Sequence, residues 1–234
     1  MLLKIGVKKG LRNKEHIEKD YYQDLILYQI YKRSNAFVFK GGTALYKFYG
    51  LKRFSADIDF TLLEKIDIER LFNKIAVSVK ADIDSKIMKD SVLFKLKFKG
   101  ILTKRNMIRV DISTKNKVLK GFDLKAYVPE YPDVNPFYLK VLKPEEMIAE
   151  KVHSLLAREN ARDLYDLFFL LRFSKFDKKL VEEKLEIFNM NFSPRKLKKR
   201  IENLKVVWDD ELKPFVLEEL PNFEMVKRFV LERI

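Results

Sequence analysis

The chain has 234 residues, and its 48 Lys and Arg against 34 Asp and Glu give a formal net charge of +14. This length suits one large domain or two small ones, and 47% hydrophobic with 35% charged residues is a globular composition. The absence of Cys excludes disulfides, thiolate zinc sites and cysteine nucleophiles, and two His exclude a multi-histidine metal site. No segment resembles a signal peptide or reaches the roughly 18 apolar residues of a membrane span, so we expect a soluble, cytoplasmic protein that does not contact membranes.

The basic residues are concentrated in two parts of the chain. Residues 1–50 and 151–200 each carry a net charge of +6. A surplus of this size predicts attraction to polyanions such as nucleic acid. A lysine-rich surface, as in proteins from thermophiles or AT-rich genomes, accounts for the same composition and stays open as an alternative.

The first half of the chain mixes predicted helices and strands. Helical spacing of apolar residues predicts helices at 14–33 and about 67–81, and a short helix from Thr43 to Gly50. Short apolar or alternating runs predict strands at 37–39, 57–63, 92–98 and 107–113. The segment 129–136 contains three prolines and is typical of a loop or linker.

The second half is predicted to be almost wholly helical. After a last strand, FYLKVL at 137–142, a proline at 144 begins a series of helices near 144–158, 160–173, 178–189, 194–206 and 221–233. Strands mixed with helices, followed by a run of helices, predict an α+β protein. We expect a mixed sheet with flanking helices in a domain at 1–136, and a mainly helical domain at 137–234.

Two carboxylates are the sharpest local signal. On a strand, Asp57 and Asp59 project from one face while Ile58 turns to the core. Carboxylates held side by side repel each other unless a cation lies between them, and hard oxygen ligands of this kind suit Mg²⁺ or Mn²⁺. A lone Asp-x-Asp more often lies in a solvated loop, so this motif alone does not distinguish a metal site from such a loop.

Two further features favour the metal interpretation. Gly41 and Gly42 join an apolar strand to a helix start, a turn at which backbone N–H groups approach a phosphate closely. Asp111 lies on the polar face of a later strand and would complete a two-metal site or act as a base. Asp123 is a weaker candidate because its neighbours do not alternate.

At these residues the sequence resembles a known family. The segment GGTALYKFYGLKRFSADIDF at 41–60 is similar to the AbiEii/AbiGii toxin family, within the DNA polymerase beta-like nucleotidyltransferases. The resemblance implies a nucleotidyltransferase-type sheet, in which the glycine turn, with Thr43 and Ser55, binds the triphosphate and Arg53 offsets its charge. It also implies that Asp57 and Asp59 bind catalytic metal, two Mg²⁺ or Mn²⁺ ions, with Asp111 as the third acid.

A second motif lies in the helical half. Lys151 falls inside the apolar arc of its helix, and a core-facing ammonium needs an anionic partner, for which Asp163 and Asp166 are the candidates. A structural ion pair or a snorkelling lysine explains this pattern without any function. The AbiEii-like resemblance extends to this block and implies that Lys151 contacts nucleotide phosphates and that Asp166 is a functional acid, with Arg162 and Asp163 bracing the helices.

The leading hypothesis is therefore a metal-dependent nucleotidyltransferase that uses an NTP. The resemblance and the basic surplus favour an RNA acceptor, the 3′ end of tRNA, and a toxin with a possible cognate antitoxin. A protein hydroxyl as acceptor and a non-catalytic nucleotide- or RNA-binding module are the alternatives. The basic run Arg195–Arg200, with Phe188 and Phe192 nearby, fits either an RNA contact or a solvated helix face. His153 fits a packed or surface residue better than a catalyst.

Overall fold

The computed structural model describes all residues, 1–234, and divides into two compact units. The sheet unit comprises 1–44, 54–116 and 122–141, and the helical unit comprises 45–53, 117–121 and 142–234. No helix combines the length and the apolar character that crossing a membrane requires. The prediction of an α+β fold is confirmed.

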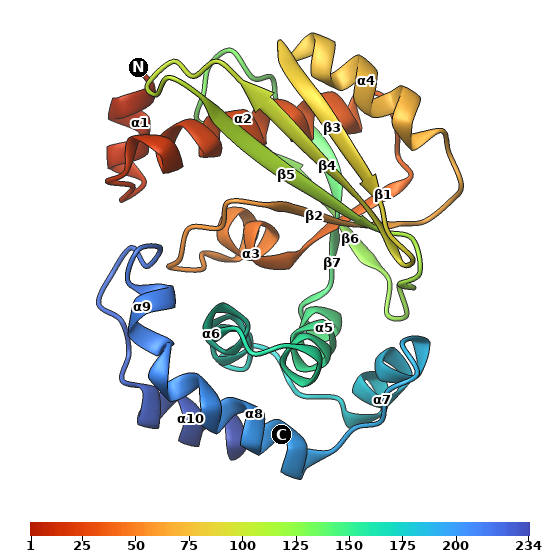
Figure 1. Cartoon of the computed structure of the whole chain (residues 1–234), viewed down its shortest axis with the longest axis vertical. Helices are drawn as coiled ribbons and strands as arrows, with labels where there is room; N and C mark the ends of the chain where they lie inside the picture. The colour runs from red at the N-terminus through yellow and green to blue at the C-terminus, as the bar shows by residue number, and fades with distance from the viewer. The chain divides into compact units, whose positions relative to one another are not determined.

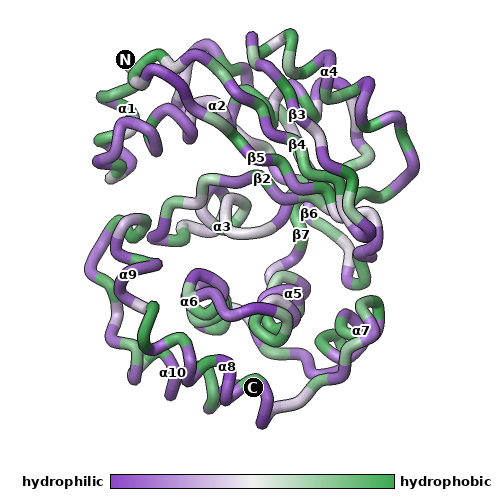
Figure 2. The backbone as a smooth tube through the Cα atoms, in the orientation of Figure 1, coloured by the Kyte–Doolittle hydropathy of each residue, from purple (hydrophilic) through white to green (hydrophobic).

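The sheet unit is built on a seven-stranded mixed sheet in the order β3-β4-β5-β2-β1-β7-β6 (Figure 1). Its strands are β1 (Phe37–Lys40), β2 (Ile58–Leu62), β3 (Ala81–Ile87), β4 (Ser91–Phe98), β5 (Asn106–Ser113), β6 (Phe122–Tyr127) and β7 (Phe137–Leu142). β1 pairs antiparallel with β2 and parallel with β7, and β2 pairs parallel with β5. β4 pairs antiparallel with β3 and β5, and hydrophobic and hydrophilic residues alternate along these strands (Figure 2).

Helices α2 (Lys14–Tyr31) and α4 (Ile68–Ser78) cover one face of the sheet, while α1 (Leu2–Lys8) packs on α2 and α3 (Gly41–Tyr49) follows β1 directly (Figure 1). The core between sheet and helices is aromatic, since Phe72 of α4 stacks on Phe94 of β4 at 4.3 Å. α2 also buries carboxylates, each with partners. Glu18, for example, accepts from the backbone N–H of Leu102 at 2.7 Å and so fixes the β4–β5 loop.

The helical unit is organised around α5 (Pro144–Ala157), which packs against three other helices, one of them α6 (Ala161–Leu170), its neighbour in Figure 1. The remaining elements are α7 (Lys178–Ile187), α8 (Pro194–Asn203), the 3₁₀ turn η1 (Leu204–Val206), α9 (Trp208–Leu212) and α10 (Phe223–Leu231). Lys184 is buried and pairs with Glu146 at 2.7 Å and Glu150 at 3.3 Å. Glu146 also accepts from the backbone N–H groups of Leu119 and Lys120, which attaches the segment 117–121 to this unit.

The structure differs from the expected elements in identifiable places. β3 and β6 were not predicted, because they form the two edges of the sheet and carry mostly exposed or half-exposed residues. The predicted helix at 194–206 ends in a 3₁₀ turn, and α1 and α9 are additional short helices.

The unit boundary also differs from the single division expected at residue 136. The strand at 137–142 pairs with β1, so the sheet unit extends to residue 141. The segment 45–53 belongs to the helical unit, where Arg53 bridges to Val216 and the Leu217 N–H donates to the Lys52 carbonyl at 2.9 Å.

Candidate active site

Two of the predicted acids lie side by side in the middle of the sheet. Asp59 of β2 and Asp111 of β5 are register partners on neighbouring parallel strands, so their side chains leave the same face. The residues that flank each of them, such as Ile58 and Val110, are fully buried, while both carboxylates are partly accessible. The alternation that predicted two separate polar positions therefore produces one carboxylate pair.

Asp57 lies two residues before Asp59, immediately before β2 begins. Burial raises the pKa of Asp111 above its ordinary value, and the negative charge of Asp57 contributes to the rise. The charges of Lys40 and Arg109 act in the opposite direction without cancelling it. Asp57 and Asp111 are thus electrostatically coupled, and Asp59 lies beside Asp111 in the sheet.

Gly41 lies directly against this group. Its φ is +75°, a conformation that residues with a side chain rarely adopt, and a Cβ atom at this position would overlap the Asp59 carboxylate. α3 starts at this glycine, so the helix N-terminus is next to Asp59. A glycine is required here for close approach as well as for backbone conformation.

The loop that carries Asp57 is held by two buried side chains. The Thr43 hydroxyl lies within hydrogen-bond reach of the backbone carbonyls of Ser55 (3.2 Å) and Asp57. Gln23 of α2 donates from its Nε2 to the Ser55 carbonyl at 2.7 Å. In this structure, therefore, Thr43 positions the Asp57 loop.

The predicted residues of the helical unit form a separate ion cluster. Arg53 is 3% exposed and donates from Nε and Nη2 to Asp166, which is fully buried, at 2.8–3.0 Å. The Lys151 ammonium lies 2.7 Å from Asp166 and 2.9 Å from Asp163. Arg158 forms the last ion pair of the cluster, with its Nε 3.0 Å from a carboxylate oxygen of Asp163. The ion pairs that the sequence offered as alternatives for Lys151 are both present.

The charges in this cluster stabilise one another. Burial alone would lower the pKa of Lys151, but Asp163 and Asp166 outweigh it and raise that pKa. Burial alone would raise the pKa of Asp163, but Lys151 and Arg158 outweigh it and lower that pKa to about 2. Two carboxylates, Asp163 and Asp166, are thus shared among three cations, Arg53, Lys151 and Arg158.

Other predicted residues lie outside these two groups. Arg162 has its guanidinium 5.4 Å from the Phe215 ring and its Nε 3.4 Å from Asn160, contacts typical of a brace. His153 stacks on Phe188 at 4.2 Å, which agrees with a packed residue. Phe192 lies 5.7 Å from the Phe176 ring.

Sequence reasoning missed Lys40 and Gln23. Lys40 is the register partner of Asp59 across β1 and β2, and its charge reaches Asp111. Its place directly before the glycine pair was a usable signal. Gln23 gave none, because a polar residue inside a helix is expected to face solvent until the loop that it holds is known.

No three His, Asp or Glu side chains lie close enough together to form a ready metal cage. The acids present are oxygen donors only, because the chain contains no Cys and neither His is among the residues of the acid group. This donor chemistry is the kind that Mg²⁺ and Mn²⁺ prefer.

Comparisons with known proteins identify the fold and the family of the chain. The chain resembles the solved structure of MenT4, a nucleotidyltransferase toxin from Mycobacterium tuberculosis, with a TM-score of 0.72 and 19% identity over 100% of this chain and 88% of that one. It also resembles JHP933 from Helicobacter pylori, with a TM-score of 0.57 and 21% identity over 94% and 90% of the two chains. These likenesses establish the fold, and no curated protein sequence matches the chain. The model of the family described as "Nucleotidyl transferase AbiEii toxin, Type IV TA system" matches residues 25–228. The chain therefore belongs to the AbiEii nucleotidyltransferase toxins of toxin–antitoxin systems.

Proposed function

We propose that this nucleotidyltransferase moves a nucleoside monophosphate from an NTP to a hydroxyl of RNA, most specifically the 3′ end of tRNA. The observation that carries the proposal is the in-register pair Asp59 and Asp111 beside Gly41, with Asp57 two residues before β2. An acid pair against a helix N-terminus combines metal-binding oxygens with backbone N–H groups suited to phosphate.

The proposal includes a divalent metal, two Mg²⁺ or Mn²⁺ ions, held by Asp57, Asp59 and Asp111. Burial raises the pKa of Asp111 and the negative charge of Asp57 adds to the rise, and the repulsion between the two carboxylates is one that a cation relieves. When bound, such ions supply charge neutralisation for the triphosphate and the leaving pyrophosphate.

The chain's own residues have distinct proposed roles. The backbone at Gly41 and Gly42 approaches the phosphates, and Thr43 keeps Ser55 and Asp57 in place. Asp111 either holds metal or takes the proton of the acceptor hydroxyl, whose oxygen attacks the α-phosphorus while the α–β phosphoanhydride bond breaks.

In the helical unit we propose Arg53 and Lys151 as the cations that offset phosphate charge. Asp166 pairs with both cations and Asp163 with Lys151, which fixes the positions of the two cationic groups.

Charge supports RNA as the acceptor over a protein hydroxyl. The net charge is +14, and α8 buries Leu197 and Ile201 while its basic side chains face solvent: Arg195, Lys196, Lys198 and Lys199. A protein acceptor needs no such surface, whereas RNA binding depends on it and weakens as salt rises.

The test is incubation of the purified chain with each labelled NTP, Mg²⁺ and total tRNA. We expect label on the tRNA 3′ end with the wild type and its loss in Asp57→Asn and in Asp59→Asn. Asp123→Asn is the matched control, because it removes a carboxylate of the same unit that is not part of the acid group.

Three outcomes would contradict the proposal. Label on protein instead of RNA identifies the protein-hydroxyl alternative. No label with any acceptor, together with equal NTP binding by the wild type and both variants, identifies a non-catalytic binding module. Undiminished transfer in the presence of EDTA excludes the proposed metal.

A further inference from the structure

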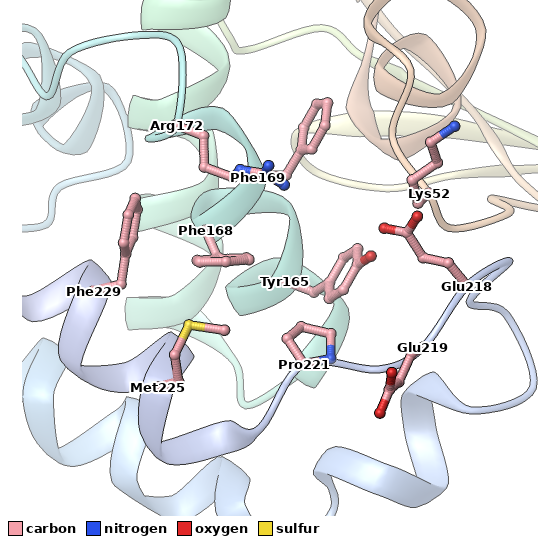
Figure 3. Close-up of a pocket in the computed structure, with 10 residues that line it drawn as sticks. All are labelled: Lys52, Tyr165, Phe168, Phe169, Arg172, Glu218, Glu219, Pro221, Met225 and Phe229. Atoms are coloured by element: carbon pink, nitrogen blue, oxygen red, sulfur yellow. The ribbon is translucent and has the colours of Figure 1, made fainter.

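The helical unit contains a pocket of about 360 Å³ that none of the roles above uses. Figure 3 shows that one side is formed by residues of α6, such as Tyr165 and Phe168, and that Met225 and Phe229 of α10 lie across from them. The volume is of the order that a small organic ligand occupies in proteins.

The inner part of the pocket is aromatic. The Phe168 and Phe229 rings meet edge to face, with centroids 5.0 Å apart and planes at 77°. The Arg172 guanidinium lies 5.9 Å from the Phe168 ring, which combines a cation with an exposed aromatic surface. Such a wall favours a flat, polarisable ring over a branched aliphatic chain.

Tyr165 brings a hydrogen-bonding group that the protein leaves unused. The residue is 4% exposed, its hydroxyl has no hydrogen-bond partner within the chain, and the hydroxyl oxygen itself stays accessible to solvent. Because Tyr165 lines the pocket and its hydroxyl is accessible there, the hydroxyl is open to a polar atom of a ligand. Burial and the charge of Glu218 raise the pKa of Tyr165 to about 12, so the group is a neutral phenol able to donate near neutral pH.

Both signs of charge surround the opening. Lys52 and Arg172 are exposed and make no ion pair, and Glu218 and Glu219 are equally unpaired. The exposed Arg172 guanidinium suits an anionic group, while the carboxylates suit the N–H donors of a heterocyclic ring. A ring with a polar edge and an attached anion meets all of these requirements.

We propose that this pocket binds a single nucleotide, with its base against Phe168 and Phe229 and its phosphate at Arg172. The Tyr165 hydroxyl and the Glu218 carboxylate receive the polar edge of the base. The nucleotide is either free or an unpaired residue of single-stranded RNA. The RNA source rests on the proposed function, in which RNA is the acceptor. The free-nucleotide source does not, because binding a nucleotide in this pocket requires no nucleotidyl transfer.

Trp208 provides a local reporter. It is the chain's one tryptophan, its ring lies 6.4 Å from that of Tyr165, and its Nε1 donates to the carbonyl of Pro221, a lining residue, at 3.0 Å. The full chain, without metal and with EDTA, is titrated with the four nucleoside monophosphates, with ribose 5-phosphate and with an unstructured RNA tetranucleotide. Saturable change in Trp208 emission measures binding.

We expect saturation by nucleotides or by the RNA, and much weaker binding of ribose 5-phosphate. Tyr165→Phe should weaken binding about two- to tenfold, because one hydrogen bond is lost. Phe168→Ala should weaken it about tenfold or more through lost stacking. Arg172→Gln should weaken it too, whereas Arg228→Gln, which removes an exposed cation of α10 that does not line the pocket, should not.

Response to monophosphates shows that a free nucleotide suffices, and response to the RNA alone assigns the pocket to an RNA residue. Equal binding of ribose 5-phosphate, unchanged affinity in Tyr165→Phe and Arg172→Gln, or no saturable response to any probe would each overturn the inference. A failed transfer assay with a normal Trp208 response would reject only the proposed function. Normal transfer with no Trp208 response would reject only this pocket.

Discussion

Replacing Asp166 by Asn tests how the ion cluster of the helical unit is held together. The substitution keeps the side-chain shape but removes the charge that Arg53 contacts at 2.8–3.0 Å and Lys151 at 2.7 Å. Arg53 is 3% exposed and its partner fully buried, so water cannot replace the lost carboxylate. Removing one partner of such a buried pair costs about 3–5 kcal/mol of unfolding free energy.

Asp163→Asn is the matched comparison, and the structure predicts a smaller effect. Lys151 keeps Asp166 as a partner, and Arg158 is 64% exposed, so it can be hydrated instead. The fall of the Asp163 pKa from 3.8 to about 2 corresponds to a few kcal/mol, on the order of 2. The expected order of destabilisation is therefore Asp166→Asn above Asp163→Asn.

The assay is urea unfolding of the full chain at neutral pH, followed by the emission of Trp208, which is buried in the helical unit. A double-mutant cycle with Arg53→Met and Asp166→Leu then isolates the pair. Removing both partners should cost less than the sum of the single changes, with a coupling of about 1.5 kcal/mol or more.

Two results would refute this reasoning. If Asp166→Asn costs less than about 1 kcal/mol, the pair is effectively solvated and behaves as a surface ion pair. If Asp163→Asn costs as much as Asp166→Asn, the cluster is centred on Lys151 and Asp163, and the contacts of Arg53 contribute little.

Three further predictions concern the same two groups of residues. Because the pKa of Asp163 is lowered from 3.8 to about 2, its contribution to the free energy of unfolding is fully present above pH 3.8 and is lost as the pH falls through about 2. The urea midpoint of the wild type should therefore drop more over this pH range than that of Asp163→Asn. Parallel curves for the two proteins would contradict this. Gly41→Ala should destabilise more than Gly50→Ala, since both glycines have a φ near +75° but only a Cβ at Gly41 meets Asp59; equal thermal midpoints would show that the carboxylate simply moves away. Thr43→Val should cost about 1–3 kcal/mol because the carbonyls of Ser55 and Asp57 lose the one buried hydroxyl that they share. Thr43→Ser should retain most of the stability, and a similar loss in both variants would assign the effect to packing.

Much of the candidate site could be predicted because local patterns encode it. Alternation alone placed Asp59 and Asp111 on polar strand faces, and the structure agrees with both positions. The helical arc of α5 predicted that Lys151 needs an anion, and its two carboxylates are those expected. Such features follow from side-chain periodicity within one element, which does not depend on the rest of the fold.

The edges and the connections between elements were harder to predict. β3 and β6 carry few buried residues, so their sequences contain little hydrophobic periodicity. Their strand conformation depends on hydrogen bonding to the neighbouring strands of the sheet. The assignment of residues 45–53 to the helical unit depends on the bridge from Arg53 to Val216, two residues separated by most of the chain. Pairing between distant segments is decided by packing and not by local propensity.

The sequence by itself determined the α+β class, the order of strands before helices and the chemistry of the carboxylates, because these depend on composition and short-range periodicity. Only the tertiary structure decided that Asp59 and Asp111 are neighbours in register, that Gly41 must lack a side chain, and that Arg53 shares Asp166 with Lys151. These features depend on which strands and helices meet, and that choice is made when the whole core is buried at once.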